Sequence, residues 1–316
     1  MNSSEIKQEW LVIVNPNAGK AKGKKDWTKI ASLLQLYNIS FKAFFTITCR
    51  HAIVLTHEGI SAGFRKIIAI GGDGTMNEVV NGVFTQSVCD TKEISLAMIT
   101  VGTGNDWGKL FGIPIDYEEA VKIIKEYKIR LQDTGIVYYY HGINRESRYF
   151  LNIAGIGFDA LVVKRTNTQR EKGYKGKLIY FINLLRSLML YRYTETSVEI
   201  DGTKILDDIF TISIGIGRYS GGGMMQTPRA IPDDGLFDIT VISKMTKGDI
   251  ILSLKMLYDG TILEHPRING YKGKDIIIDS DPLIHLEADG ESLGHSPIEL
   301  KILPKSVHIV YDKFPV

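Results

Sequence analysis

Cysteine is scarce in this sequence of 316 residues, because only Cys49 and Cys89 are present, far apart and without a CxxC spacing. Such usage argues against a zinc site or a disulfide scaffold and indicates a reducing compartment, with both cysteines expected as buried free thiols. An excess of charge of either sign is also missing. The net charge of +2 gives no reason to expect a nucleic-acid partner.

Long hydrophobic runs are absent too. No apolar stretch reaches the roughly 18 to 20 residues that a membrane-spanning helix needs. Residues 1–8 are polar and lack the apolar core of a secretory signal, so the sequence predicts a cytoplasmic protein. A hydrophobic content of 44% still allows a sizeable core, and the length favours two domains.

The first part of the chain alternates short apolar runs with amphipathic segments. The pattern predicts strands at 10–14, 40–46, 66–70 and 94–100, and helices at 27–36, 51–61, 76–84 and 117–127. Strands that alternate with helices form a parallel sheet covered on both faces. Ligands of such sheets bind at the carboxyl ends of the strands.

Beyond Asp133 the pattern changes to long alternating segments, which predict an antiparallel sheet domain built from hairpins. One hairpin turn is expected at Asp201-Gly202, and helices are expected at 178–191 and 247–258. The expected strand segments are 137–152, 197–200, 207–215, 238–243, 275–278, 283–288 and 298–303.

The first motif follows the first strand and reads NPNAGK, from Asn15 to Lys20. A glycine-bearing loop with Lys20 and its neighbouring lysines offers N–H groups and positive charge to a phosphate. It is not a Walker loop, since Gly19 and Gly23 lack the required spacing and no Ser or Thr follows the lysine. By itself it is equally well an ordinary surface turn.

The second motif, GGDGTMNE from Gly71 to Glu78, follows the strand at 66–70. Its three glycines allow a close approach to an anion, which Asp73 would repel unless a cation lay between them. Magnesium that bridges nucleotide phosphates explains this combination, and Thr75 is expected to cap the next helix. A merely structural turn is the alternative.

The third motif, GTGNDW from Gly102 to Trp107, follows the fourth strand, so it is expected at the same edge of the sheet. Like the second motif, it combines glycines with a carboxylate, here that of Asp106 as a second acid. Its spacing misses the GxGxxG dinucleotide fingerprint, which argues against a Rossmann dehydrogenase. Asp133, near the domain junction, is either a third acid of the same site or a turn residue.

Taken together, these motifs resemble the diacylglycerol kinase catalytic domain family, which includes bacterial soluble lipid kinases and sphingosine and ceramide kinases. The resemblance spans nearly the whole chain. Thr46 with His51-Ala52 fits the family's T-x-x-x-x-H-A pattern, residues 228–238 are similar to its P-x-A-x-x-D-D-G-x-x-D stretch, and Asp289-Gly290-Glu291 matches its D-G-E motif.

The resemblance implies the role of each matching residue. Asp73, Asp106 and Asp133 would form an acidic network with magnesium, and Asp289 or Glu291 would be the general base. Asp234, with backbone oxygens of Ile231 and Leu236, would bind a separate structural magnesium, although Ile231 departs from the family's polar preference. The nucleotide-binding set comprises Asn15, Pro16, Asn17, Gly19, Lys20, Thr46, Gly71, Gly72, Asp73, Gly74, Thr75, Asn77, Glu78, Gly102, Thr103, Gly104 and Asn105.

Lipid access has the weakest sequence support. Residues 178–191 read LIYFINLLRSLMLY and have basic flanks, which suits either a helix resting on an anionic membrane or, more commonly, a core helix with solvated ends. The loop 220–225 could line an acyl-chain cleft or be a flexible connection. Asp289-Gly290 could be a bare hairpin turn rather than part of a base.

The sequence therefore predicts a three-layer α/β nucleotide-binding domain, residues 1–133 with the tail 308–316, and an antiparallel β-sandwich-like domain, residues 134–307. The active site would occupy the cleft between them. The expected activity is ATP- and Mg²⁺-dependent transfer of phosphate to a lipid hydroxyl, most simply that of diacylglycerol, by an enzyme peripheral to the inner face of the membrane. A homodimer is left open. An NAD kinase-like enzyme and an inactive nucleotide-responsive lipid-binding protein are the alternatives.

Overall fold

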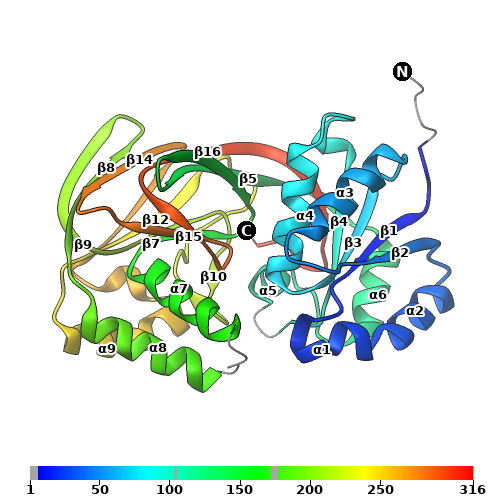
Figure 1. The fold of residues 1–316 in the computed structure, drawn as a ribbon, viewed down its shortest axis with the longest axis horizontal. Coiled ribbons are helices and arrows are strands. Elements are labelled where there is room, and N and C mark those ends of the chain that lie inside the picture. Colours follow the sequence, from blue (N-terminus) through cyan, green and yellow to red (C-terminus); the bar gives the residue numbers. More distant parts are fainter. Residues whose placement is uncertain (1–5, 103–104, 172–176, 316) are drawn as a thin grey trace. The chain divides into compact units, whose positions relative to one another are not determined.

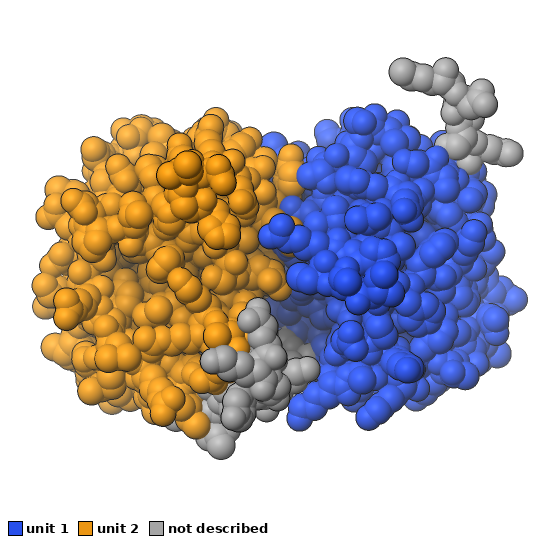
Figure 2. All heavy atoms as spheres, in the orientation of Figure 1, with its two compact units in different colours: residues 1–134, 303–316 blue, residues 135–302 orange. Residues whose placement is uncertain are grey.

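The fold was analysed on a computed structural model that describes residues 6–102, 105–171 and 177–315, without the side chains of 170–181 (Figure 1). The chain divides into two compact units, coloured separately in Figure 2. Unit 1 comprises Met1–Thr134 and Leu303–Val316, and unit 2 comprises Gly135–Ile302.

The sheet of unit 1 consists of parallel strands in the order β2-β1-β3-β4, to which the end of a long strand, β16, is added beside β4. Every residue of β1 and β4 is buried, as expected for strands covered on both faces. The strands are β1 (Trp10–Val14), β2 (Phe41–Phe45), β3 (Lys66–Gly71), β4 (Ser95–Thr100) and β16 (Glu291–Val310).

The connections of unit 1 reverse direction at β1. The chain leaves β1 toward β2 on one side, returns past β1 to β3, and continues to β4 on the other side. Right-handed crossovers therefore place α2 on one face of the sheet and both α3 and α4 on the other. Helix α3 packs on α4, and helix α2 packs on α6 (Figure 1). The helices are α1 (Ala18–Lys25), α2 (Trp27–Leu36), α3 (His51–Ser61), α4 (Asp73–Thr85), η1 (Thr91–Glu93), α5 (Asp106–Leu110) and α6 (Tyr117–Glu126).

Unit 2 is built from antiparallel strands, two of which, β9 and β16, are long enough to pair with different partners along their length. The first half of β9 pairs with β8, and residues 211–215 pair with β7. The strands are β5 (Ile129–His141), β6 (Asn144–Phe150), β7 (Ile153–Gly157), β8 (Thr194–Ile200), β9 (Thr203–Gly215), β10 (Tyr219–Ser220), β11 (Met224–Met225), β12 (Phe237–Ser243), β13 (Ile268–Gly273), β14 (Asp275–Asp281) and β15 (His285–Ala288).

Two hydrophobic clusters organise unit 2. One is formed by side chains such as Val198, Ile214 and Leu286 on the inner faces of the strands. The other lies where the helices pack on the outer face of β9 and β12, and it contains Phe158, Leu184 and other apolar side chains (Figure 1). The helices are α7 (Phe158–Glu171), α8 (Lys177–Leu190), α9 (Lys247–Asp259) and η2 (Ile262–Glu264).

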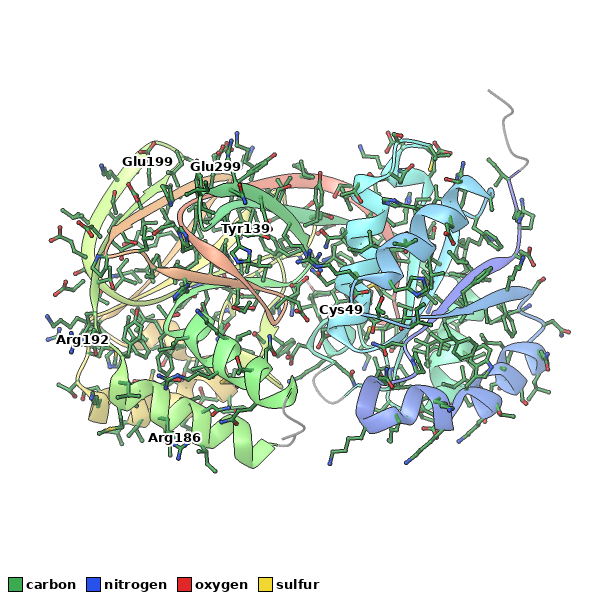
Figure 3. All side chains as sticks on the ribbon, viewed as in Figure 1. Cys49, Tyr139, Arg186, Arg192, Glu199 and Glu299 are labelled. Atoms are coloured by element: carbon green, nitrogen blue, oxygen red, sulfur yellow. The ribbon has the colours of Figure 1, made fainter. Side chains whose placement is uncertain are left out.

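The predicted fold class is confirmed, an α/β unit followed by a β-rich unit, but several local predictions are wrong. The expected segment 137–152 is a hairpin of β5 and β6 that turns at Gly142, which has a φ of +62°. The helix expected from residue 76 begins at Asp73, and α1, α5 and α7 were not expected. Cys49 is exposed and Cys89 partly exposed, so neither is a buried thiol (Figure 3).

Among the described residues, no helix is both long enough and apolar enough to cross a membrane. Helix α8 packs on unit 2 with one of its sides. Leu184 and Leu188 are buried in the helical cluster, whereas Met189 and Leu190 are exposed.

The burial of unit 1 predicts a contrast between two isoleucines. Ile68→Ala in β3, where the side chain is fully buried, is expected to lower the free energy of unfolding by about 2–5 kcal/mol because it leaves a cavity. Ile47→Ala, at a side chain that is 77% exposed, is the control and is expected to change it by less than about 0.5 kcal/mol. Urea unfolding followed by tryptophan fluorescence measures unit 1, since Trp10, Trp27 and Trp107 all belong to it. Equal effects of the two changes would contradict the described core.

Candidate functional site

The loops after β1 and β3 meet where the connections of the sheet reverse direction. This is the place where parallel α/β sheets bind their ligands. Asn15 Nδ2 donates to Thr75 Oγ1 at 3.1 Å, and the Asn15 N–H donates to Ile70 O at 2.9 Å. The structure thus joins the first and second motifs directly, as their positions in the sequence predict.

The first motif is not a simple loop, because its residues lead into α1 with an unusual backbone. Gly19, Lys20 and Ala21 have φ values of +58°, +61° and +67°, which interrupt regular helix geometry. A Cβ on Gly19 would lie 1.8 Å from Val101 O. Glycine is required here because the backbone itself presses against the end of β4.

Asp73 connects the second motif to the third. Its Oδ2 accepts the N–H of Asp106 and its Oδ1 accepts the N–H of Trp107, each at 3.1 Å, so its carboxylate holds the start of α5. Thr75 is not the cap of α4, because the helix begins at Asp73 after Gly72. Gly102 also approaches Gly72 so closely that a Cβ on Gly102 would lie 2.8 Å from the Gly72 Cα.

Other predicted nucleotide residues take supporting positions in the same unit. Glu78 accepts the N–H groups of Arg50 at 2.9 Å and Ala52 at 3.1 Å, and so caps the start of α3. Asn77 is buried and accepts from Asn81 Nδ2. Thr46 is buried at the end of β2, where its N–H donates to Val14 O. Thr103 and Gly104 lie outside the described residues.

Asp133 is fully buried on β5, where its Oδ1 accepts the N–H of Lys305 at 2.6 Å. Its neighbour Gln132 accepts from Trp107 Nε1 at 3.1 Å. The third motif is therefore tied to β5 through Trp107, while Asp133 fastens the returning end of β16.

The acids of unit 1 do not form a ready-made metal cage. Within residues 6–102, 105–171 and 177–315, no group of three or more His, Cys, Asp or Glu side chains is placed to hold a metal ion. Magnesium in nucleotide-dependent enzymes is commonly held by one or two carboxylates together with substrate phosphates and waters. Asp73 and Asp106, which lie together, fit that kind of site, with the phosphates as the remaining ligands.

The second predicted metal site, in unit 2, has its ligand atoms engaged by protein donors. Asp234 Oδ1 accepts the N–H of Leu236 at 3.0 Å, and Asp234 Oδ2 accepts Lys272 Nζ at 2.8 Å. Ile231 O accepts the N–H of Asp234 at 3.4 Å.

Asp289 and Gly290 form a tight hairpin turn between β15 and β16, with φ values of +48° and +81° that suit a type I′ turn. Asp289 and Gly290 thus make the hairpin turn that the sequence suggested, and Asp289 does more than turn the chain. Its carboxylate accepts the N–H groups of Leu151, Asn152 and Ile153 at 3.0, 3.0 and 3.2 Å. Glu291, which follows the turn, is exposed.

The sequence prediction missed two acids beside this turn, the buried Glu287 and the partly buried Asp159. Glu287 is 2% exposed and accepts the N–H of Gly290 at 2.8 Å. Burial raises the pKa of Glu287 well above its ordinary value, and the nearby Asp159 adds to the rise. The only signal in the sequence is an acid between the apolar residues Leu286 and Ala288.

Glu287 belongs to a row of small and polar residues that crosses four neighbouring strands. Glu287 lies opposite Gly155, Gly155 opposite Ser213, and Ser213 opposite Thr240. Residues directly opposite one another in antiparallel strands point to the same face. The row faces the helices, because Asp159 of α7 lies 3.5 Å from Ser213 Oγ.

A small cavity of about 50 Å³ lies between this face and helices α7, α8 and α9. Most of its lining is apolar and includes Val162, Leu184, Met224, Leu254 and Leu257. Apolar walls with a few polar groups are typical of sites for small organic ligands. Met224 comes from the glycine-rich loop that the sequence suggested as part of an acyl-chain cleft.

The polar end of the cavity holds Asp159, Ser213, Gln226 and Thr240. Gln226 Nε2 donates to Asp159 Oδ2 at 3.1 Å, and burial raises the pKa of Asp159 to about 6. In the described part of the chain, Gln226 Oε1 and Thr240 Oγ1 are buried and have no hydrogen-bond partner. Unpaired buried polar atoms are costly, so this end of the cavity is suited to a ligand with a polar group.

Comparison with known proteins identifies the family. Residues 9–137 match the family described as "Diacylglycerol kinase catalytic domain", and residues 152–311, half of the chain, match the "YegS C-terminal NAD kinase beta sandwich-like domain". The chain belongs to the diacylglycerol kinase catalytic domain family. The resemblance stated from the motifs is therefore confirmed, and so is the prediction of a phosphotransferase.

Relatives in this family match over almost their full length. The chain is 29% identical to "Putative lipid kinase YtlR" of Bacillus subtilis (strain 168), covering 95% of this chain and 98% of that protein. It is 28% identical to a diacylglycerol kinase of the same organism, covering 96% of each. The "Crystal structure of a putative diacylglycerol kinase from Bacillus anthracis str. Sterne" is 27% identical with a TM-score of 0.79, covering 99% of this chain and 98% of that chain.

Yeast NADH kinase shares the fold, with a TM-score of 0.54 at 12% identity, covering 96% of this chain and 84% of that chain.

The raised pKa of the partly buried Asp159 predicts a pH effect on stability. The unfolded carboxyl ionises near 3.8 and the folded one near 6, so the unfolded state releases its proton first as the pH rises, and stability falls across that interval. Asp159→Asn has no carboxyl to ionise in this interval. Between pH 4 and pH 7 its free energy of unfolding is therefore expected to rise by up to about 3 kcal/mol relative to that of the natural protein. The measurement is urea unfolding by circular dichroism at several pH values, with the exposed Asp279→Asn as control. If the difference in the free energy of unfolding between Asp159→Asn and the natural protein does not change with pH, the pKa of Asp159 is not raised by folding.

Proposed function

We propose that the protein transfers the γ-phosphate of ATP to the hydroxyl of a membrane lipid, most simply diacylglycerol, in a magnesium-dependent reaction. Family membership supports kinase activity, and relatives named diacylglycerol kinase suggest the acceptor. The observation that carries the choice of a lipid is the cavity of unit 2, because its apolar walls and unpaired polar end suit a molecule with a hydrocarbon chain and a polar group.

The nucleotide is assigned to unit 1. The backbone N–H groups of the glycine-rich loops and the start of α4 provide donors and a positive helix end for the phosphates. Asp73 and Asp106 would hold magnesium, which would neutralise charge on the phosphates when bound. Asp73 also fixes the third motif through two N–H groups, so the same carboxylate serves both structure and metal binding.

The acceptor is assigned to unit 2. In the reaction, the lipid oxygen forms a bond to the γ-phosphorus, the bond from that phosphorus to the bridging oxygen breaks, and ADP leaves. The hydroxyl proton passes to a carboxylate of the turn formed by Asp289, Gly290 and Glu291. The three N–H groups that hold Asp289, and the Glu287 contact with Gly290, would keep this turn in place during the reaction.

The acceptor would be met at the membrane surface. Ile182, Met189 and Leu190 of α8 are exposed, by 40%, 67% and 66% of their surface. Arg186 and Arg192, also exposed, lie on or just after the same helix (Figure 3). Apolar side chains next to cationic ones are typical of helices that rest on anionic lipid. Other basic residues precede or begin this helix in the sequence, and the structure does not describe their side chains: Arg170, Lys172, Lys175 and Lys177.

The proposal predicts that labelled γ-phosphate moves from ATP to a lipid in mixed micelles when magnesium is present. Asp73→Ala is expected to lower the rate at least about 100-fold, because it removes a carboxylate next to the phosphates. Asp312→Ala, at an exposed acid in the same unit, is the control and should retain activity. The measurement is the initial rate over a panel of diacylglycerol, phosphatidylglycerol, a polyprenol and a sphingoid base.

NAD is included in the same assay as a water-soluble acceptor. If NAD is the only acceptor that becomes labelled, the protein is an NAD kinase-like enzyme and the proposal is wrong. ATP binding without any labelled product would instead support a nucleotide-responsive lipid-binding protein.

A second prediction concerns the cavity. Leu254→Trp places a larger side chain in its lining and is expected to raise the KM for a long-chain diacylglycerol about tenfold or more, with a smaller effect on a short-chain one. Leu252→Trp is a matched control on the same helix, since its side chain is 77% exposed. Equal KM values for the two variants would show that the lipid chain does not use this cavity.

A further inference from the structure

Lys272 stands where the family pattern places a metal ion. It lies on β13 directly opposite Asp238 of β12, and its Nζ donates to Asp234 Oδ2 at 2.8 Å. The Asp234 side chain is 22% exposed and that of Lys272 38%. The strand pairing therefore holds the ammonium group at the segment that contains Ile231, Asp234 and Leu236.

The carboxylate of Asp234 already has a cationic partner in the protein, in addition to a backbone donor. Asp234 Oδ1 accepts the N–H of Leu236, Asp234 Oδ2 accepts Lys272, and Ile231 O accepts the N–H of Asp234. Magnesium requires about six oxygen ligands near 2.0–2.1 Å and resists losing its water. A divalent ion on Asp234 would also be repelled by an ammonium group at hydrogen-bond distance from the same carboxylate.

A second acid lies beside the same lysine. Asp238 is 2% exposed and stands directly opposite Lys272 in the pairing of β12 with β13. Its Oδ2 accepts the N–H of Arg229 at 2.9 Å. Lys272 is therefore next to two carboxylates of one short segment.

We infer that Lys272 Nζ supplies, as part of the chain, the positive charge that the family pattern assigns to a structural magnesium ion at Asp234. This segment of unit 2 then folds without a divalent metal. The inference does not depend on the proposed function, because it concerns the segment's stability and not phosphate transfer. Of the two magnesium ions expected from the sequence, the protein then needs only the one that accompanies the nucleotide.

The test compares thermal unfolding in EDTA and in millimolar MgCl₂, without nucleotide. The midpoint of the natural protein is expected to be the same in both, within about 1 °C. Lys272→Met leaves two acids without their cation and is expected to unfold at least about 3 °C lower in EDTA. Added magnesium should restore part of this loss in the variant. Lys244→Met is the matched control, because Lys244 makes an ion pair of the same 2.8 Å length with Asp208 at an exposed position.

A further measurement needs no lysine variant. Binding of Mn²⁺ to the nucleotide-free protein is followed by electron paramagnetic resonance, for the natural protein and for Asp234→Asn. The same amount of bound Mn²⁺ in both is the expected result. Metal binding or magnesium-dependent stabilisation of the natural protein that Asp234→Asn removes would overturn the inference, whatever the lysine variant does.

Discussion

The candidate nucleotide site depends on one carboxylate, that of Asp73, which accepts two N–H groups from the start of α5. These bonds bring the loop after β3 and the loop after β4 together, at a place where glycines allow the two backbones to approach closely. A longer side chain at Gly72 or Gly102, or a neutral one at Asp73, would separate them. The loop conformation at this edge of the sheet is thus held by a carboxylate of the protein itself.

In unit 2, by contrast, two acids lie where water has little access. Asp159 and Glu287 lie on or against the face of the strands that the helices cover, and burial opposes the ionisation of both. Such an arrangement costs stability, and natural proteins tolerate that cost mainly at functional sites. Here Asp159 lines the polar end of the cavity, and Glu287 holds the turn at Gly290.

Much of this could be predicted from the sequence because the signals are local. The strand Trp10–Val14 and the helix His51–Ser61 were predicted with the bounds that the structure gives, since a continuous apolar run and a helical period define them. The turn at Asp289-Gly290 has an equally local cause. The positive φ values of Gly19, Lys20 and Ala21 were not predictable, because nothing local in the sequence shows that Gly19 lies against Val101 O. Likewise, nothing near Glu287 or Lys272 in the sequence indicates which helix covers the first or which strand pairs with the second.

Strand β9 has a consequence for how unit 2 can move. Its first half is hydrogen-bonded to β8, and residues 211–215 lie between β7 and β12, so a single uninterrupted strand belongs to both layers of the sandwich. The layers cannot slide past each other without breaking the backbone pairing of β9 itself. The strand that provides Thr211 and Ser213 to the cavity is therefore clamped at both ends, and any widening of the cavity to admit a ligand has to come from the helices.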